Sequence, residues 1–225
     1  MGLSWVVLCQ LGGWSTLVIV VGCKNRYSTT MKALKISDRV LRLEQLALRA
    51  RVSLDLWIGL HLDTAREPFN NALDSFEDYW RFARSDHEDV FIIRITNLFT
   101  QDKRTENFQS LLAAAKKSGE ISKDVLVACN AKILALGDLP QRVALIRNMS
   151  SAHQHRSIKR NELFSQAKIS LNLMTQYSDT ALELSSMLLR GIGYEPISQS
   201  NIIKPADTLA ELLDILEQQQ AITSS

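Results

Sequence analysis

A long apolar stripe through residues 34–62 constrains the fold more than any other feature of this sequence. Apolar side chains recur there at alternating steps of four and three residues, the spacing that lines one face of an α-helix. The stripe consists of Ile36, Val40, Leu43, Ala47, Ala50, Leu54 and Trp57. We interpret it as a core or helix-pairing face, and the arginines beside it, Arg39, Arg42, Arg49 and Arg51, as a solvated face.

Glycine and proline are scarce in the chain, at nine and four among 225 residues. Because these residues mark turns, their scarcity favours long helices over a β-sandwich, and no segment alternates like a strand. The sequence therefore predicts an all-α helical bundle with long antiparallel helices. Further helices are predicted at residues 107–117, 122–135, 160–191 and 209–216.

Several residues predict where helices begin. A second helix is expected to open at Pro68 and to run through Phe82, and a third to open at Ser85. Ser85 and Glu88 have the spacing of a capping box, which gives the acidic and histidine cluster at 86–89 a structural explanation rather than a metal. Residues 90–99 are apolar nearly all round, so this helix should lie in the centre of the bundle.

Other residues predict where helices end. Gly137 should end one helix, with Asp138 capping the next and Pro140 entering it. The pair Gly191 and Gly193 should end the helix at 160–191. The glutamines at 218–220 are expected to fray.

Composition excludes several classes of protein. The formal net charge is only +2, so a broadly basic surface is not expected and any RNA site must be local. Cys9, Cys23 and Cys129 are odd in number and lack C-x-x-C spacing, which indicates neither a disulfide framework nor a zinc site. A reducing cytoplasm is the simplest location, and we expect no metal and no cofactor.

Residues 1–30 form an apolar N-terminal extension with a basic flank at Lys24 and Arg26. Three interpretations compete: a short membrane anchor, a signal sequence, or a start assigned too early, with Met31 as the true start. A signal peptide should begin with positive charge, which this segment lacks. The main domain is expected to span residues 31–220, and a membrane is a partner only if the extension is a genuine anchor.

A polar motif interrupts the helix predicted after Pro140: Arg147 and Asn148 are followed by His153. Histidine can move protons near neutral pH, and arginine offers a planar, always-charged fork that suits phosphate. Cutting RNA without a metal needs both functions. Asn148 could orient the arginine or bind the ribose. The alternative is a surface arginine near a satisfied histidine. His155 is a second candidate for the imidazole.

The spacing of the motif has a geometric consequence. Six residues of regular helix turn through about 600°, which leaves Arg147 and His153 about 120° apart. They could then meet at one phosphate only if the helix ends near Ser150 and Ser151, or if a second chain completes the site.

Arg94 and Asn97 lie three residues apart in the apolar helix at 90–99 and therefore share a face. Because a buried arginine is costly without a partner, we expect an internal ion pair, with Asp55 or Asp63 as candidates. The functional alternative is that this face lines the same cleft as Arg147, so Arg94 and Asn97 are secondary site candidates.

From about residue 34 to 216 the chain resembles the HEPN superfamily, in particular its AbiU-type abortive-infection branch. The specific element is the segment from Arg147 to His153; the first helix, the helix at 90–99 and the helix containing Asn172 are similar only as helix patterns. The resemblance implies a homodimer around the motif helices and metal-independent cleavage of RNA in phage defence or as a toxin. Arg147 would then stabilise the phosphate, His153 act as acid or base, and Asn148 orient.

Two alternatives stay open from the sequence. One is an N-terminally anchored helical scaffold, which requires that residues 1–23 are genuine. The chain could also be a non-catalytic HEPN-type helical module that binds a partner or a nucleotide, with the same arginine and histidine serving as ligands or as relics. The nearly neutral charge favours this function, and the intact motif favours the ribonuclease.

Overall fold

The computed structural model describes residues 34–61, 69–100, 105–149, 160–196 and 205–223, and every regular element within these ranges is a helix. The predicted all-α class is therefore confirmed. The described helices belong to one compact unit, Lys35–Ser225. Residues 1–33, which include the whole apolar extension and Met31, lie outside the described residues. None of the helices in the described ranges has both the length and the apolar character needed to cross a membrane.

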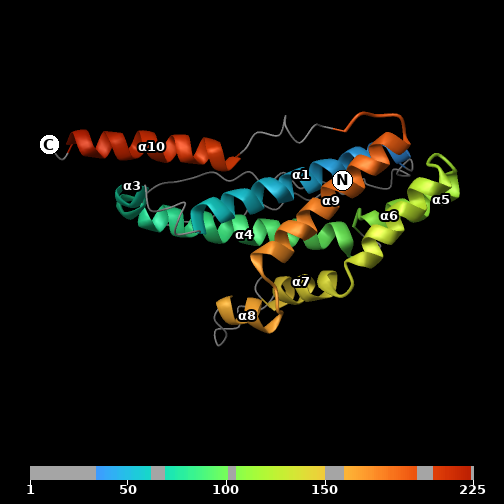
Figure 1. Ribbon diagram of the computed structural model, residues 1–225, viewed down its shortest axis with the longest axis horizontal. Coiled ribbons are helices and arrows are strands. Elements are labelled where there is room, and N and C mark those ends of the chain that lie inside the picture. Colours follow the sequence, from blue (N-terminus) through green and yellow to red (C-terminus); the bar gives the residue numbers. More distant parts are fainter. Residues whose placement is uncertain (1–33, 62–68, 101–104, 150–159, 197–204, 224–225) are drawn as a thin grey trace, which may run out of the picture. The chain divides into compact units, whose positions relative to one another are not determined.

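Helices α1 (Ile36–His61) and α4 (Glu77–Phe99) lie side by side and run in opposite directions (Figure 1). The predicted stripe is the buried face of α1: Val40, Leu43 and Leu54 are completely buried, and Trp57 packs at its edge. Full burial of each leucine contributes about 1.5–3 kcal/mol. The stripe therefore holds α1 against its neighbours, as the sequence predicts.

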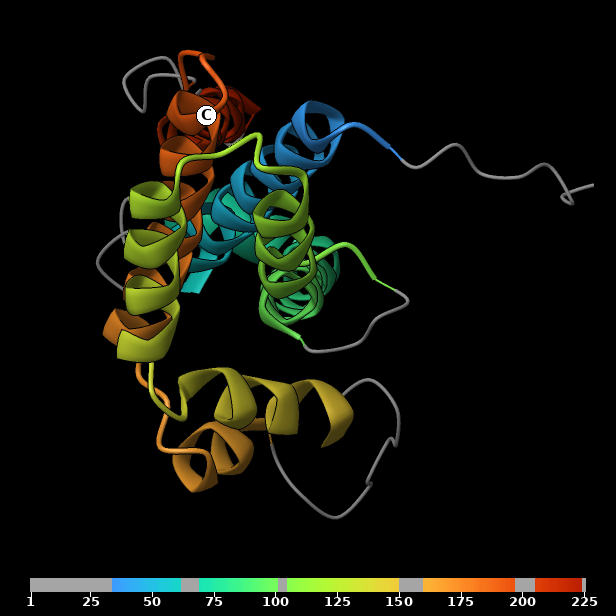
Figure 2. The same ribbon diagram turned by 90° about the vertical axis from the view of Figure 1, so that its right-hand side faces the viewer.

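Helix α9 (Leu171–Gly191) packs across α1 and completes the core. Its Tyr177 ring lies 4.5 Å from the Phe99 ring, which in turn lies 5.2 Å from Phe108 (centroid distances). Helix α6 (Lys123–Ala135) runs alongside α9, with α7 (Leu139–Arg147) below them (Figure 2).

The predicted start of a helix at Ser85 is wrong. Ser85 lies inside α4, which runs without a break from Glu77, and the interruption falls at Phe76, between α4 and the short α3 (Asn70–Ser75). Trp80, Phe91 and Leu98 are spaced eleven and seven residues apart, so one continuous helix puts all three on the same buried face. The burial of these three side chains stabilises the continuous helix by more than the roughly 1 kcal/mol that a cap contributes.

The helix boundaries predicted in the middle of the chain are confirmed, but the prediction that Asp138 caps α7 is wrong. Helix α5 (Phe108–Ser118) begins at a reciprocal capping box between Asn107 and Ser110, and α6 and α7 have nearly the expected bounds. Gly137 has a φ of 57°, which a glycine adopts without cost. Asp138 stands at the N-cap of α7 but its side chain makes no cap hydrogen bond; it instead accepts a long one from Arg142 (3.5 Å).

The helix predicted over residues 160–191 is two helices, α8 (Arg160–Gln166) and α9. The amide of Lys168 donates to the carbonyl of Ser165, and that of Ile169 to the carbonyl of Phe164. This is a Schellman ending, in which Lys168 takes the left-handed position (φ 50°) that glycine usually occupies. Ser170 then caps α9 by accepting from the amide of Leu173.

Lys168→Gly should raise the free energy of unfolding by about 1 kcal/mol, because a side chain in the left-handed region costs about that much. Urea denaturation followed by circular dichroism measures the change. The matched control is Lys116→Gly in α5, where glycine should instead lower stability by about 1 kcal/mol. Equal destabilisation by both variants would contradict the strained ending of α8.

Helix α10 (Pro205–Thr223) is longer than predicted and includes the glutamines that were expected to fray. It contacts α1 and α3, where Leu213 joins Leu60, Leu73 and Trp80 in a small second core. The carboxylate of Glu217 accepts a hydrogen bond from the amide of Ala72 (2.7 Å) in the first turn of α3. These contacts are formed between distant parts of the chain and stabilise the end of α10.

The arginines beside the stripe are only partly a solvated face. Arg39 binds Glu106 at 2.7 Å, and Arg51 pairs with both Asp55 and Asp179. The first pair ties α1 to the start of α5, and the second ties α1 to α9. Arg42 and Arg49 are exposed, as the sequence predicts.

Candidate functional site

Arg147 is the last residue of α7, and the packing of that helix positions it. Val143 and Ile146 are buried and hold one face of α7 toward the core, where the helix contacts α4. Arg147 follows Ile146 by one residue, about 100° around the helix, so its side chain lies at the edge of the buried face and is half-buried.

The side chains of Arg147 and Asn148 are joined by two hydrogen bonds. The Nε and Nη2 atoms of Arg147 donate to Oδ1 of Asn148 at 3.1 and 2.9 Å. A neutral amide oxygen fixes the direction of the guanidinium without cancelling its charge. Within the described ranges, no carboxylate pairs with Arg147. The arrangement is therefore suited to an anion such as a phosphate.

His153 and His155 lie outside the described residues, so the structure does not place either imidazole against Arg147. The α-helix ends at Arg147, and Asn148 and Met149 follow in a wider helical turn. The predicted separation of about 120° between Arg147 and His153 depends on residues 150–153, which lie outside the described part of the chain, so it stays a prediction.

Arg94 does not pair with Asp55, one of the two carboxylates that were expected to bind it. Its Nη1 donates to the backbone carbonyl of Arg49 (3.1 Å) and to the hydroxyl of Ser53 (3.2 Å), while Asp55 pairs with Arg51 instead. Asp63 lies outside the described residues. Burial lowers the pKa of Arg94, and the neighbouring charge of Arg49 adds to that effect.

The bonds of Arg94 tie α4 to α1, which is a structural role. The described contacts do not join Arg94 or Asn97 to Arg147. The structure thus gives no support for a common cleft between these secondary candidates and the motif.

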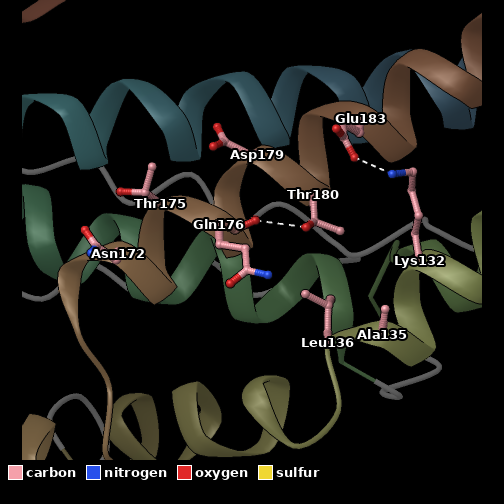
Figure 3. A pocket seen from close by; sticks show the side chains of 9 residues that line it. All are labelled: Lys132, Ala135, Leu136, Asn172, Thr175, Gln176, Asp179, Thr180 and Glu183. Carbon is pink, nitrogen blue, oxygen red and sulfur yellow. Dashed lines mark hydrogen bonds and ion pairs between the residues drawn. The ribbon is translucent and has the colours of Figure 1, made fainter.

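A polar groove between α6 and α9 was not expected from the sequence. It has a volume of about 540 Å³ and is open to solvent (Figure 3). A salt bridge crosses the groove from Nζ of Lys132 in α6 to Oε2 of Glu183 in α9, at 2.6 Å. Its other lining residues are Ala135, Leu136, Asn172, Thr175, Gln176, Asp179 and Thr180. The two walls are far apart in sequence, so no local pattern could have revealed the groove.

Asp179, which lines the groove, and Asp55 of α1 both pair with Arg51. Burial raises the pKa of Asp55, an effect that the guanidinium of Arg51 opposes and the carboxylate of Asp179 reinforces. Arg51 therefore serves to hold two carboxylates together between α1 and α9. In the part of the chain that the structure describes, no group of histidine, cysteine, aspartate or glutamate side chains could hold a metal ion.

Cys129 is buried in α6, and burial raises the pKa of its thiol to about 11. At neutral pH the thiol stays protonated, and a protonated thiol is a poor nucleophile. Cys129 is therefore a core residue rather than a catalytic one.

Comparisons with family models, with curated proteins and with solved structures find no match to this chain.

Proposed function

We propose that this protein is a metal-independent endoribonuclease of a bacterial phage-defence or toxin system. The observation that carries the proposal is the guanidinium of Arg147, which the amide of Asn148 orients and which pairs with no carboxylate among the described residues. In RNA cleavage of this kind, negative charge builds on the phosphate oxygens in the transition state. An oriented arginine stabilises that charge, which is the role we assign to Arg147.

His153 supplies proton transfer in this proposal, with His155 as the second candidate. The ribose 2′-oxygen attacks phosphorus and loses its proton, and the 5′-oxygen leaves and gains one. An imidazole can perform either transfer near neutral pH. The products are a 2′,3′-cyclic phosphate and a free 5′-hydroxyl. As in the family that the motif resembles, we propose that the protein works as a homodimer in the cytoplasm.

A second candidate function follows from the groove between α6 and α9. Its amide, hydroxyl and carboxylate side chains could bind a nucleotide or a partner through hydrogen bonds, without chemistry. Arg147 does not line this groove. A non-catalytic HEPN-type binding module would use this surface rather than the motif.

Incubation of the full chain with end-labelled single-stranded RNA in excess EDTA distinguishes the two functions. We expect fragments that end in a 2′,3′-cyclic phosphate, because the 2′-hydroxyl is the nucleophile. Cleavage that requires added Mg²⁺, or fragments with a different end, would contradict the proposed mechanism. Intact RNA together with saturable nucleotide binding would favour the binding module.

A further inference from the structure

Two arginine side chains lie together at one edge of the contact between α1 and α4. Arg49 of α1 precedes the completely buried Ala50, and Arg94 of α4 precedes the completely buried Ile95. One residue of helix turns through about 100°, so each arginine stands at the border of the buried face of its helix. The two borders meet, because Nη1 of Arg94 donates to the carbonyl of Arg49 (3.1 Å) and to the hydroxyl of Ser53 (3.2 Å).

No carboxylate among the described residues pairs with either guanidinium. Both acceptors of Arg94 are uncharged oxygens, and its Nε and Nη2 atoms bond to no described residue. The side chain of Arg49 is exposed and forms no hydrogen bond or ion pair within the described ranges. By contrast, Arg39 and Arg51 of the same helix are each held by carboxylates. Arg49 and Arg94 therefore keep donors that can bind an anion.

The positive charges of the two arginines repel each other. Burial lowers the pKa of Arg94, and the neighbouring charge of Arg49 lowers it further. Like charges that lie close together without a counter-ion disfavour each other's charged form. An anion bound by both guanidiniums would remove this repulsion, and the planar N–H groups of arginine match the oxygens of a phosphate group.

We propose that Arg49 and Arg94 together bind a backbone phosphate of a nucleic-acid strand. The pair lies at a surface edge between two helices, where a free phosphate ion would keep much of its hydration and bind weakly. A strand gains affinity because it contacts a protein at several phosphates, each of which releases counter-ions. The net charge of +2 requires such contacts to be local, as this one is. The inference concerns binding alone and goes beyond the cleavage proposed for Arg147.

Titration of a fluorescein-labelled 2′-O-methyl RNA oligomer with the full chain, at a series of KCl concentrations, tests the site. The oligomer lacks the 2′-hydroxyl nucleophile, so binding is measured without cleavage. Arg49→Gln should weaken binding by about three- to tenfold. It should also reduce the slope of the logarithm of affinity against the logarithm of salt concentration by about 0.7, the value for one lost phosphate contact on a single strand.

Arg81→Gln is the matched control. It removes an arginine of α4 whose guanidinium is already held by Asp78, so both affinity and salt slope should stay unchanged. Arg49→Gln carries the test rather than a variant of Arg94, because Arg94 also ties α4 to α1. The substitution at Arg49 keeps the backbone carbonyl to which Arg94 donates. Thermal unfolding by circular dichroism should therefore show equal stability for both variants and the natural chain.

Three results would overturn the inference. They are a natural chain that does not bind the oligomer, equal salt slopes for Arg49→Gln and Arg81→Gln, and stabilisation by inorganic phosphate that requires Arg49 while the oligomer is not bound. The last result would make the occupant a free anion.

Cleavage of unmodified RNA, measured on the same samples, separates this inference from the proposed function. Uncut RNA together with the expected salt slopes would defeat the ribonuclease and leave the phosphate site standing. Cleavage together with equal slopes for the two variants would do the reverse.

Discussion

Arg147→Ala should reduce the rate of RNA cleavage by about 10²–10⁴-fold while the protein stays folded, because a positioned group that stabilises transition-state charge typically contributes that much. Arg147 is half-buried at the end of α7 and its described bonds go to Asn148, so its removal leaves the core packing intact. Initial rates on a defined RNA measure the effect. Arg42→Ala, which removes an exposed arginine from α1, serves as the control and should retain full activity.

Asn148 offers a sharper version of the same test. Asn148→Asp keeps the shape of the side chain and both hydrogen bonds, but it places a negatively charged carboxylate beside the guanidinium of Arg147. The carboxylate would then compete with the phosphate, so this variant should lose more activity than Asn148→Ala, which only removes the orienting contact. If Asn148→Asp is as active as the natural chain, the positive charge of Arg147 does not serve a phosphate.

Tyr177→Ala should lower the free energy of unfolding by about 3–5 kcal/mol, the usual cost of removing a large buried ring. Tyr177 of α9 is completely buried, with its ring against Phe99 of α4. Urea denaturation measures the loss. The exposed Tyr194 provides the control, since Tyr194→Ala should change stability by no more than about 0.5 kcal/mol.

Tyr177→Phe should instead raise the free energy of unfolding. The structure describes no hydrogen-bond partner for the Tyr177 hydroxyl, and burial raises its pKa well above the usual value. Removing a buried hydroxyl that lacks a partner should raise stability by about 1 kcal/mol. A loss comparable to that of Tyr177→Ala would mean that the hydroxyl is bonded in the folded protein.

The sequence predicted those elements whose signals are local. The stripe of α1, the glycines that end α6 and α9, and the start of α5 depend on residues within one or two turns of each other. Local signals failed where packing competed with them. Ser85 looks like a helix start, but Trp80 and Phe91 are buried on one face only if α4 continues through it. The break at Lys168 has no glycine to mark it.

The candidate site likewise includes interactions between sequence neighbours, which the sequence revealed, and interactions between distant residues, which it did not. The spacing of Arg147 and Asn148 was visible in the sequence, and their direct contact is a local interaction between neighbours. The partners of Arg94 and Arg51 were not visible, because they depend on how α1 packs against α4 and α9. The groove between α6 and α9 likewise exists only when those two helices lie together.

By itself, the sequence determined the helical class, the buried face of α1 and the residues of the motif, because helix periodicity and residue chemistry act over a few positions. The tertiary structure decided which arginines are held by carboxylates, where α4 begins and α8 ends, and which side of α6 is left in solvent. These outcomes depend on contacts between residues tens of positions apart. Their energies of a few kcal/mol exceed the capping and propensity terms of about 1 kcal/mol that local sequence expresses.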